Sequence, residues 1–342
     1  MGLVRWRVVA GVVAFALALL ACGARTGMDA ATRGTEGVDA GEGAGEGGAP
    51  AGLRQVLLYG GLRHTSLTQP PTALGDMWLW DGSRWAELPA SDPGPRSCAS
   101  AATLGTETIL FGGADDDATW IWDGARWTAR HVSGPSARGG AAMSTLGGVV
   151  VLFGGGDPSA PLGDTWTWDG AEWKRHDVPG PPPRTFAAAA TLGDRVVLYG
   201  GQDDSSHHVE SFDDTWTWDG GTWTQVLVAG PAKQDGNGYS TLGCSMASLG
   251  RQVVLQCDLQ TWTFDGTWWT PHPAALPIPQ PAPGGFLEYA AMSPIGSGVV
   301  LFGGWDGVED TAYTLVWSGM GDWTKLDVAG PPPRDCATVA SR

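Results

Sequence analysis

One unit recurs six times between Ala51 and Arg342, and its period limits the folds that the chain can adopt. In each copy an apolar segment ends in Gly-Gly or a substitute, and a tryptophan closes the copy about twenty residues later. The most regular copy contains Val196–Gly201, then Asp214–Gly220, then Trp223. The closing tryptophans stand at positions 85, 127, 173, 223, 269 and 323. Self-similarity at a period of 42 to 54 residues is typical of propellers and solenoids.

Each copy predicts four short β-strands. The first is rich in Ala, Gly and Ser, and the second is β-branched and ends at the Gly-Gly pair. The third alternates, as in Thr165–Trp168, and the fourth begins at the closing tryptophan. Asp-Gly between the last two strands favours a hairpin whose symmetric turn places Trp168 opposite Trp173. The same offset occurs at 80/85, 122/127, 218/223 and 264/269, so aromatic pairs would stabilise each hairpin.

Composition agrees with a turn-rich all-β fold, because 53 Gly and 24 Pro in 342 residues are many for a helical protein. A net charge of −16 argues against binding to a nucleic-acid backbone, which needs clustered cations. Hydrophobic residues make up 42% of the chain and charged residues 16%, which argues against a disordered acidic chain.

The copies resemble the Kelch-repeat β-propellers, in which a Gly-Gly pair follows an apolar strand and a tryptophan follows about twenty residues later. The resemblance covers Ala51–Arg342 and implies an all-β, six-bladed propeller with the first strand of each blade innermost. The fifth copy departs from the pattern, with Cys257-Asp258 in place of the glycine pair, and the sixth has Ser318-Gly319 in its turn.

The ends of the repeat region predict how the ring closes. Arg54–Gly61 is a second strand with no first strand before it, and Arg334–Arg342 is a first strand with nothing after it. We therefore predict that the C-terminal strand completes blade 1, which leaves only short, protected edges.

Met1–Ala24 is typical of a targeting segment, with Arg5 and Arg7 followed by 17 uncharged positions. That run is too short to span a bilayer, so residues 1–21 are predicted to be a signal peptide. Leu19–Cys22 resembles a bacterial lipobox, which implies a lipidated Cys22; the alternative is an ordinary signal peptide with an incidental cysteine. The resemblance, with Gly23 after the cysteine, implies an outer-membrane lipoprotein of the bacterial cell envelope. The Gly/Glu-rich residues 22–50 predict a flexible tether, and residues 51–342 the propeller.

The other four cysteines would lie in an oxidising compartment, where disulfides persist. Cys244 and Cys257 flank a predicted turn at Gly250-Arg251, so they should face each other, and we predict a disulfide. Cys98 and Cys336 each stand two residues after a blade-opening arginine. A bond between them would lock the closure, provided that the inner strands approach closely enough.

In a four-stranded blade the connections between strands 2 and 3 and between successive blades share one face. We name it the loop face; its connections vary in length, so we expect ligands to bind there. Four arginines open blades on this face: Arg96, Arg138, Arg184 and Arg334. They would bind carboxylate ligands at the channel mouth, or, as their repetition favours, each would brace its own connection. Trp305 and Trp268 break the repeat and are candidates for exposed ligand contacts, including sugar stacking.

One connection is rich in possible metal ligands: Asp203, Asp204, His207, His208 and Asp213. Carboxylates and imidazoles together suit a divalent cation. The alternative, a solvated acidic loop, is favoured because no spacing here matches an established ligand loop. No other cofactor is predicted.

Enzyme motifs are sparse: the sequence contains no Gly-x-Ser-x-Gly, Walker loop or Cys-x-x-Cys. It also lacks the sialidase-type Asp box and the Tyr, Cys and His set of copper oxidases with Kelch-like propellers. We therefore predict a monomeric, non-catalytic binding or scaffold module for an envelope protein or glycan, held at the membrane only by its lipid. The alternative is a carbohydrate-active enzyme on the same propeller, resembling sialate mutarotases or the oxidases.

Overall fold

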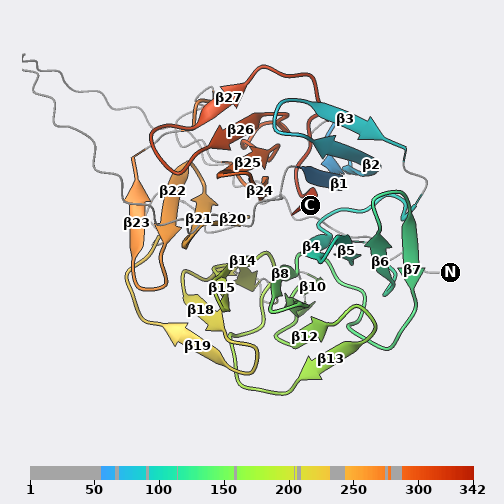
Figure 1. The fold of residues 1–342 in the computed structure, drawn as a ribbon, viewed down its shortest axis with the longest axis vertical. Helices are drawn as coiled ribbons and strands as arrows, with labels where there is room; N and C mark the ends of the chain where they lie inside the picture. The colour runs from blue at the N-terminus through green and yellow to red at the C-terminus, as the bar shows by residue number, and fades with distance from the viewer. Residues whose placement is uncertain are drawn as a thin grey trace, which may run out of the picture. The chain divides into compact units, whose positions relative to one another are not determined.

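The computed structural model describes residues 55–65, 69–89, 92–113, 115–157, 160–203, 205, 209–231, 243–273, 276–278 and 287–342. Within these residues six four-stranded antiparallel sheets surround a common axis (Figure 1). The predicted all-β, six-bladed propeller is confirmed. The predicted signal peptide, Cys22 and the tether lie outside the described residues. The described part of the chain contains no helix that is long and apolar enough to cross a membrane.

We number the blades in chain order and give their strands from the axis outward. Blade 1 contains β28 (Thr338–Ser341), β1 (Val56–Arg63), β2 (Thr72–Trp80) and β3 (Trp85–Leu88). Blade 2 contains β4 (Ser100–Leu104), β5 (Glu107–Phe111), β6 (Thr119–Trp122) and β7 (Trp127–Arg130). Blade 3 contains β8 (Ala142–Leu146), β9 (Val149–Phe153), β12 (Thr165–Trp168) and β13 (Trp173–His176).

Blade 4 contains β14 (Ala188–Leu192), β15 (Arg195–Tyr199), β18 (Thr215–Trp218) and β19 (Trp223–Val226). Blade 5 contains β20 (Ser245–Leu249), β21 (Gln252–Cys257), β22 (Gln260–Phe264) and β23 (Trp269–His272). Blade 6 contains β24 (Ala291–Ile295), β25 (Gly298–Phe302), β26 (Thr314–Trp317) and β27 (Thr324–Leu326).

The C-terminal strand closes the ring as predicted. β28 pairs antiparallel with β1, with Val56 opposite Ser341 and Tyr59 opposite Thr338. Figure 1 shows the C-terminus beside β1, so the first and last described parts of the chain share blade 1. We name the junction of blades 6 and 1 with the C-terminal segment the seam.

The predicted aromatic hairpins also form in the predicted register. Trp168 lies opposite Trp173, and the equivalent pairs of blades 1, 2, 4 and 5 lie opposite each other in the same way. The closing tryptophans then join neighbouring blades, because the indole N–H of Trp173 donates to Thr119 Oγ1 of blade 2 at 2.7 Å. Blades 1, 4, 5 and 6 repeat this bond.

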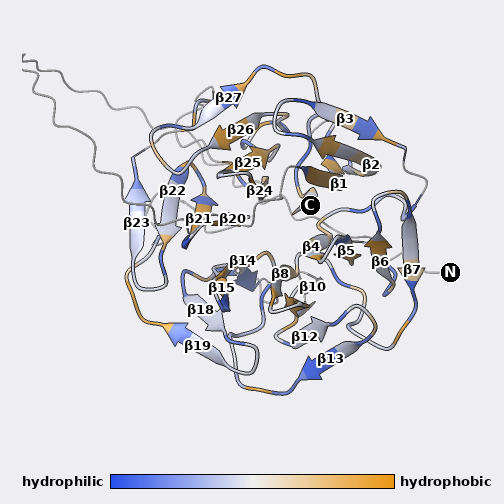
Figure 2. Ribbon diagram, in the orientation of Figure 1, coloured by the Kyte–Doolittle hydropathy of each residue, from blue (hydrophilic) through white to orange (hydrophobic). Residues whose placement is uncertain are grey.

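Apolar side chains from adjacent sheets form the core. Ile109 and Phe111 of blade 2, for example, belong to one buried cluster with Trp168 and Trp173 of blade 3. Figure 2 shows apolar colours on β1 and β25 and polar colours on the outer strands β13 and β19. Repeated burial between blades therefore fixes the scaffold that carries the connections.

The connections of the loop face differ among blades, as their sequence lengths predict. In blades 3 and 4 they form small hairpins, β10 (Gly156–Asp157) with β11 (Ala160–Pro161) and β16 (Gln202–Asp203) with β17 (Glu210–Ser211). In blade 1 the strands β1 and β2 themselves continue outward to Arg63 and Thr72. In blade 5 the strands β21 and β22 are joined by only Asp258 and Leu259.

Candidate functional site

The four blade-opening arginines lie inside the scaffold, with at most 2% of each side chain exposed. Arg184 Nη1 donates to the Gly200 carbonyl at 2.9 Å, and both Nη atoms contact Asp214, at 2.5 and 3.0 Å. Burial raises the pKa of the Asp214 carboxyl, but the hydrogen bonds and charge of Arg184 outweigh it and leave the pKa below its usual range. The equivalent pairs are Arg96 with Asp116, Arg138 with Asp164, and Arg334 with Asp76.

The arginine backbones join each blade to the preceding one. The Arg184 carbonyl accepts the Gly155 N–H of blade 3 at 2.9 Å, and Arg334 likewise links Gly304 of blade 6 to its side-chain partners in blade 1. A Cβ atom on Gly154 would lie 2.6 Å from the Arg184 carbonyl oxygen, which explains the need for glycine there. This geometry favours a structural role for the arginines, in which each braces its own connection. Their guanidinium groups are buried in ion pairs with aspartates of the propeller and are not exposed to a ligand.

Six residues of the innermost segments have left-handed backbones, with φ between 50° and 62°: Cys98, Gly140, Phe186, Gly243, Tyr289 and Cys336. Backbone hydrogen bonds link them in succession around the axis, from Gly243 through Tyr289, Cys336, Cys98 and Gly140 to Phe186. The Gly140 N–H donates to the Cys98 carbonyl at 2.8 Å, and the Phe186 N–H donates to the Gly140 carbonyl at 2.7 Å. The rings of Phe186 and Tyr289 meet edge to face at 5.1 Å. These residues line a cavity of about 160 Å³ on the axis.

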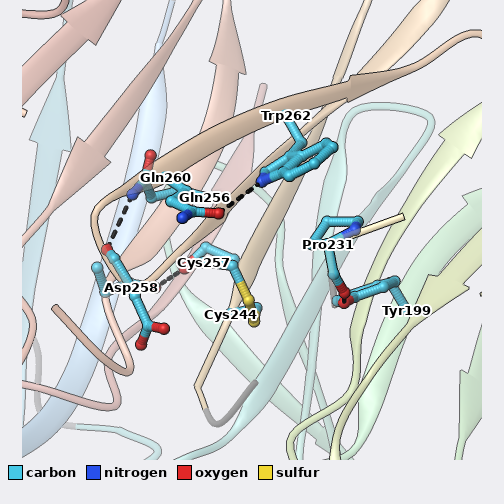
Figure 3. The surroundings of a disulfide bond; sticks show 10 residues. Tyr199, Pro231, Cys244, Gln256, Cys257, Asp258, Gln260 and Trp262 are labelled. Atoms are coloured by element: carbon cyan, nitrogen blue, oxygen red, sulfur yellow. Dashed lines mark hydrogen bonds between the residues drawn. A yellow bond between two sulfur atoms is a disulfide. The ribbon is translucent and has the colours of Figure 1, made fainter. Parts of the chain in front are cut away.

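Both cysteine pairs form disulfides in the structure. Cys98 and Cys336 have a Cα separation of 4.7 Å, because the Cys98 N–H donates to the Cys336 carbonyl at 2.9 Å and holds the two innermost segments together. This bond ties blade 2 to the C-terminal segment. Cys244 and Cys257 are joined across the β20–β21 hairpin (Figure 3), next to the pair Ser245 and Gln256, which is the register expected from the turn.

Acidic side chains gather where the repeat is least regular. Asp258 stands at the second glycine position of blade 5, directly after the disulfide (Figure 3), with φ of 53°. Glu288 and Asp335 each follow the blade-opening position of blades 6 and 1. Asp310 lies in the β25–β26 connection, and His64 follows β1. We name these five residues the acidic cluster.

Burial is the largest cause of the raised pKa values of three members. Burial raises the pKa of Asp258 to about 7. Burial, and then the charge of Asp258, raises the pKa of Glu288 to about 8. Burial, and then the charge of Asp310, raises the pKa of Asp335 to about 7, although His64 opposes this. Among the described residues, one carboxylate oxygen each of Asp258 and Asp335 is buried without a hydrogen-bond partner. Perturbed carboxyl groups of this kind mark candidate functional sites.

Trp305 lies on the loop face, as the sequence predicted, and it is next to the acidic cluster. Its ring centroid is 5.0 Å from that of His64, and its backbone pairs with Glu288 and Asp310. Trp305 is half-buried. Trp268 is 64% exposed but lies in the β22–β23 turn, on the opposite face.

The predicted metal loop is only partly described. Asp203 lies in β16 and accepts the Ser205 N–H at 2.8 Å, and Asp213 is exposed. Asp204, His207 and His208 lie outside the described residues. Across the part of the chain that is described, the group with metal-ligand spacing is instead His64, Asp310 and Asp335.

The sequence did not single out His64, Glu288, Asp310 or Asp335. The signal was present in the repeat, since the position after the blade-opening residue holds Ser97, Gly139 and Thr185 in blades 2 to 4 but an acid in blades 6 and 1. A departure from a repeated scaffold position was therefore the clue.

The opposite face offers a second surface. A cleft of about 740 Å³ lies between blades 3 and 4, lined in part by Lys174, His176 and Asp219. His176 Nε2 is already paired with Thr167 Oγ1 at 2.9 Å, and burial lowers the pKa of this imidazole. This cleft gives an alternative location against which binding at the loop face can be tested.

Comparison with known proteins agrees with this architecture. The family model described as the KLHDC2/KLHL20/DRC7 Kelch-repeats domain matches residues 51–255. No curated protein matches the chain. The matched residues end within β21, before Asp258, so most of the acidic cluster lies beyond them.

Proposed function

This chain belongs to the Kelch-repeat family, and from that membership we propose that it is a non-catalytic binding or scaffold module for a protein or glycan ligand. The module would be anchored by a lipid in the bacterial cell envelope. The loop face would bind the ligand. The observation that carries the proposal is a contrast within the scaffold. Buried arginines and tryptophans repeat from blade to blade, whereas the loop-face connections range from two residues to hairpins. Variable connections on a fixed scaffold are where binding residues concentrate.

Two features support the envelope as the location. The disulfides Cys98–Cys336 and Cys244–Cys257 are typical of exported proteins, since reducing systems keep cytosolic thiols reduced. The lipobox-like Leu19–Cys22 adds a mechanism for membrane attachment, because acyl chains on Cys22 contribute about 0.8 kcal/mol per buried CH₂.

Photo-crosslinking in intact cells tests the binding face. A photoreactive residue replaces Val308, 61% exposed in the β25–β26 connection, or Met320, 80% exposed in the β26–β27 turn. The two positions lie on opposite faces of the same blade, so they are a matched pair. We expect a discrete adduct from position 308 and none from 320. Adducts from 320, or from Lys174 in the cleft, would move the binding surface to the opposite face.

Cys22→Ser tests the anchor. We expect the wild-type chain to incorporate labelled palmitate and to fractionate with the outer membrane, and the variant to do neither. A variant that still fractionates with membranes would support a different attachment and remove the lipid from the proposal.

The acidic cluster also favours a second candidate, the carbohydrate-active enzyme. Carboxyl groups with pKa values of about 7 and 8, as in Asp258 and Glu288, suit general acid–base chemistry near neutral pH. Proton NMR of sugar anomers, sialic acids included, distinguishes the two functions. Turnover that Glu288→Gln abolishes would decide for the enzyme, whereas binding without turnover supports the module.

A further inference from the structure

We propose that His64, Asp310 and Asp335 form a binding site for a divalent transition-metal cation of the zinc class at the seam of the propeller. The inference concerns a different site from the 203–213 connection, and it does not depend on the ligand of the loop face.

The three side chains converge from segments far apart in the sequence. Each offers one donor atom, and these atoms all lie within 4.8 Å of one another. His64 Nδ1 is 3.0 Å from Asp310 Oδ1, and the backbone N–H of His64 donates to Asp310 Oδ2 at 2.5 Å. Two ligands of one tetrahedral zinc lie about 3.3 Å apart, given bonds of about 2.0–2.1 Å. His64 and Asp310 are thus already close to ligating distance.

Asp335 supplies a second, independent observation in favour of a cation site. It is 7% exposed, and its Oδ1 has no hydrogen-bond partner among the described residues. A buried carboxylate without a partner is costly, and a bound cation is one of the few groups that satisfies it. Arg334, the adjacent cation in the chain, is already bound to Asp76 and Gly60, so its charge is directed into blade 1.

The donor set selects the class of metal. One imidazole with two carboxylates matches the nitrogen and oxygen ligands of zinc, whereas calcium prefers six to eight oxygen ligands. Asp310 Oδ2 accepts a hydrogen bond from the backbone N–H of His64, and this bond orients the two side chains that would bind the metal. With three protein ligands, one coordination position stays open to water or to a ligand group beside Trp305.

A cation here would tie the seam together. His64 follows β1, Asp310 precedes β26, and Asp335 leads into β28. Metal binding would therefore join blade 1, blade 6 and the C-terminal segment, in addition to the Cys98–Cys336 bond.

Calorimetry on the chelator-treated full chain in detergent, titrated with Zn²⁺, Mn²⁺ and Ca²⁺, tests the site. We expect one Zn²⁺ per chain, with Ca²⁺ much weaker. Asp335→Asn and His64→Gln should each weaken Zn²⁺ binding by more than about 100-fold, since even outer contacts contribute 10–100-fold. Without metal, Asp335→Asn should melt no lower than wild type, because it removes a buried unpartnered charge. His176→Gln is the matched control, and its Zn²⁺ affinity should equal that of the wild type.

Two further readouts separate this site from others. Bound Zn²⁺ should slow hydrogen exchange in Thr338–Ser341 of the wild type but not of Asp335→Asn, and X-ray absorption should show nitrogen and oxygen ligands without sulfur. Absence of Zn²⁺ binding would overturn the proposal. So would equal Zn²⁺ affinity in wild type, His64→Gln and Asp335→Asn, or loss of binding in a His207→Ala/His208→Ala variant alone.

Discussion

Blades 2 to 4 and the arc from blade 5 to the seam use the same four-stranded sheet but fill its repeated positions differently. In blades 2 to 4 a buried arginine opens each blade and pairs with an aspartate of that blade. In blade 6 Leu287 stands at that position, is 3% exposed, and packs with Leu276 and Ile278 instead. The residue after it is the acid Glu288, and none of the described residues lowers its pKa with a positive charge.

The difference teaches where to look for chemistry in a repeat protein. The acids that recur at the same position in successive blades are paired with arginines and hold the blades together. Their pKa values are therefore lowered, as for Asp164 and Asp214. Charges that break the repeat are buried without such partners, so their pKa values rise, as for Asp258 and Asp335. The first group stabilises the scaffold, and the second is costly unless a ligand or metal satisfies it.

The largest test removes the seam itself. Deleting Arg334–Arg342 takes away β28, leaves β1 as an unpaired inner edge, and removes the cation that faces Asp76. We expect the free energy of unfolding to fall by more than about 5 kcal/mol, with loss of a cooperative thermal transition. Circular dichroism melting measures it. A truncated chain that melts like the full chain would refute closure by the C-terminal strand.

The two disulfides provide the next comparison. Their sequence separations are 238 and 13 residues. On chain-entropy grounds, Cys98→Ser/Cys336→Ser should cost about 5 kcal/mol and Cys244→Ser/Cys257→Ser about 3 kcal/mol. Urea unfolding of each double variant measures the difference. Equal losses would mean that the seam bond adds nothing beyond local bracing of its neighbours.

Removal of one of the repeated arginine–aspartate ion pairs tests the regular blades. Arg184→Ala leaves Asp214 and the Gly200 carbonyl without their buried partner, so we expect a loss of about 3–5 kcal/mol. Arg195→Ala, at an arginine 52% exposed, should stay within about 0.5 kcal/mol of wild type. If Arg184→Ala kept full stability and instead lost a ligand, the arginines would belong to the binding surface after all.

The sequence predicted the features that recur in every blade, and it missed the contacts that form only when the ring of blades closes. Strand order, the Trp168–Trp173 register and the closing strand follow from local periodicity and from the chain ends. The two-residue strands β10 and β11 carry too little periodicity to be distinguished from a loop. His64 and Asp310 are 246 residues apart and meet only because blade 6 adjoins blade 1. No local pattern contains that contact.

Stability as a function of pH distinguishes the buried acid of blade 5. The folded-state pKa of Asp258, about 7, lies above the ordinary aspartate pKa of 3.8, so between these two pH values the native state holds a proton that the unfolded state has lost. Deprotonation of Asp258 therefore lowers the free energy of unfolding as pH rises from about 4 to 7. Asp258→Asn should raise the free energy of unfolding by on the order of 2 kcal/mol at pH 8 and by little at pH 4. Denaturant unfolding across this pH range measures it, with the exposed Asp213→Asn as control. A wild-type and variant difference that did not change with pH would contradict it.

The smallest effect concerns one hydrogen bond between regular blades. The Trp173 indole donates to Thr119, whereas Trp127 of blade 2 faces a neighbour with Met77 at that position and has no indole partner in the described chain. Trp173→Phe should therefore cost about 1 kcal/mol more than Trp127→Phe, because it also orphans a buried hydroxyl. A double-mutant cycle with Thr119→Val isolates this bond, and a coupling energy near zero would assign the tryptophan's role to packing alone. Because the bond recurs in five blades, a coupling energy at each would add to the apolar burial that joins neighbouring sheets.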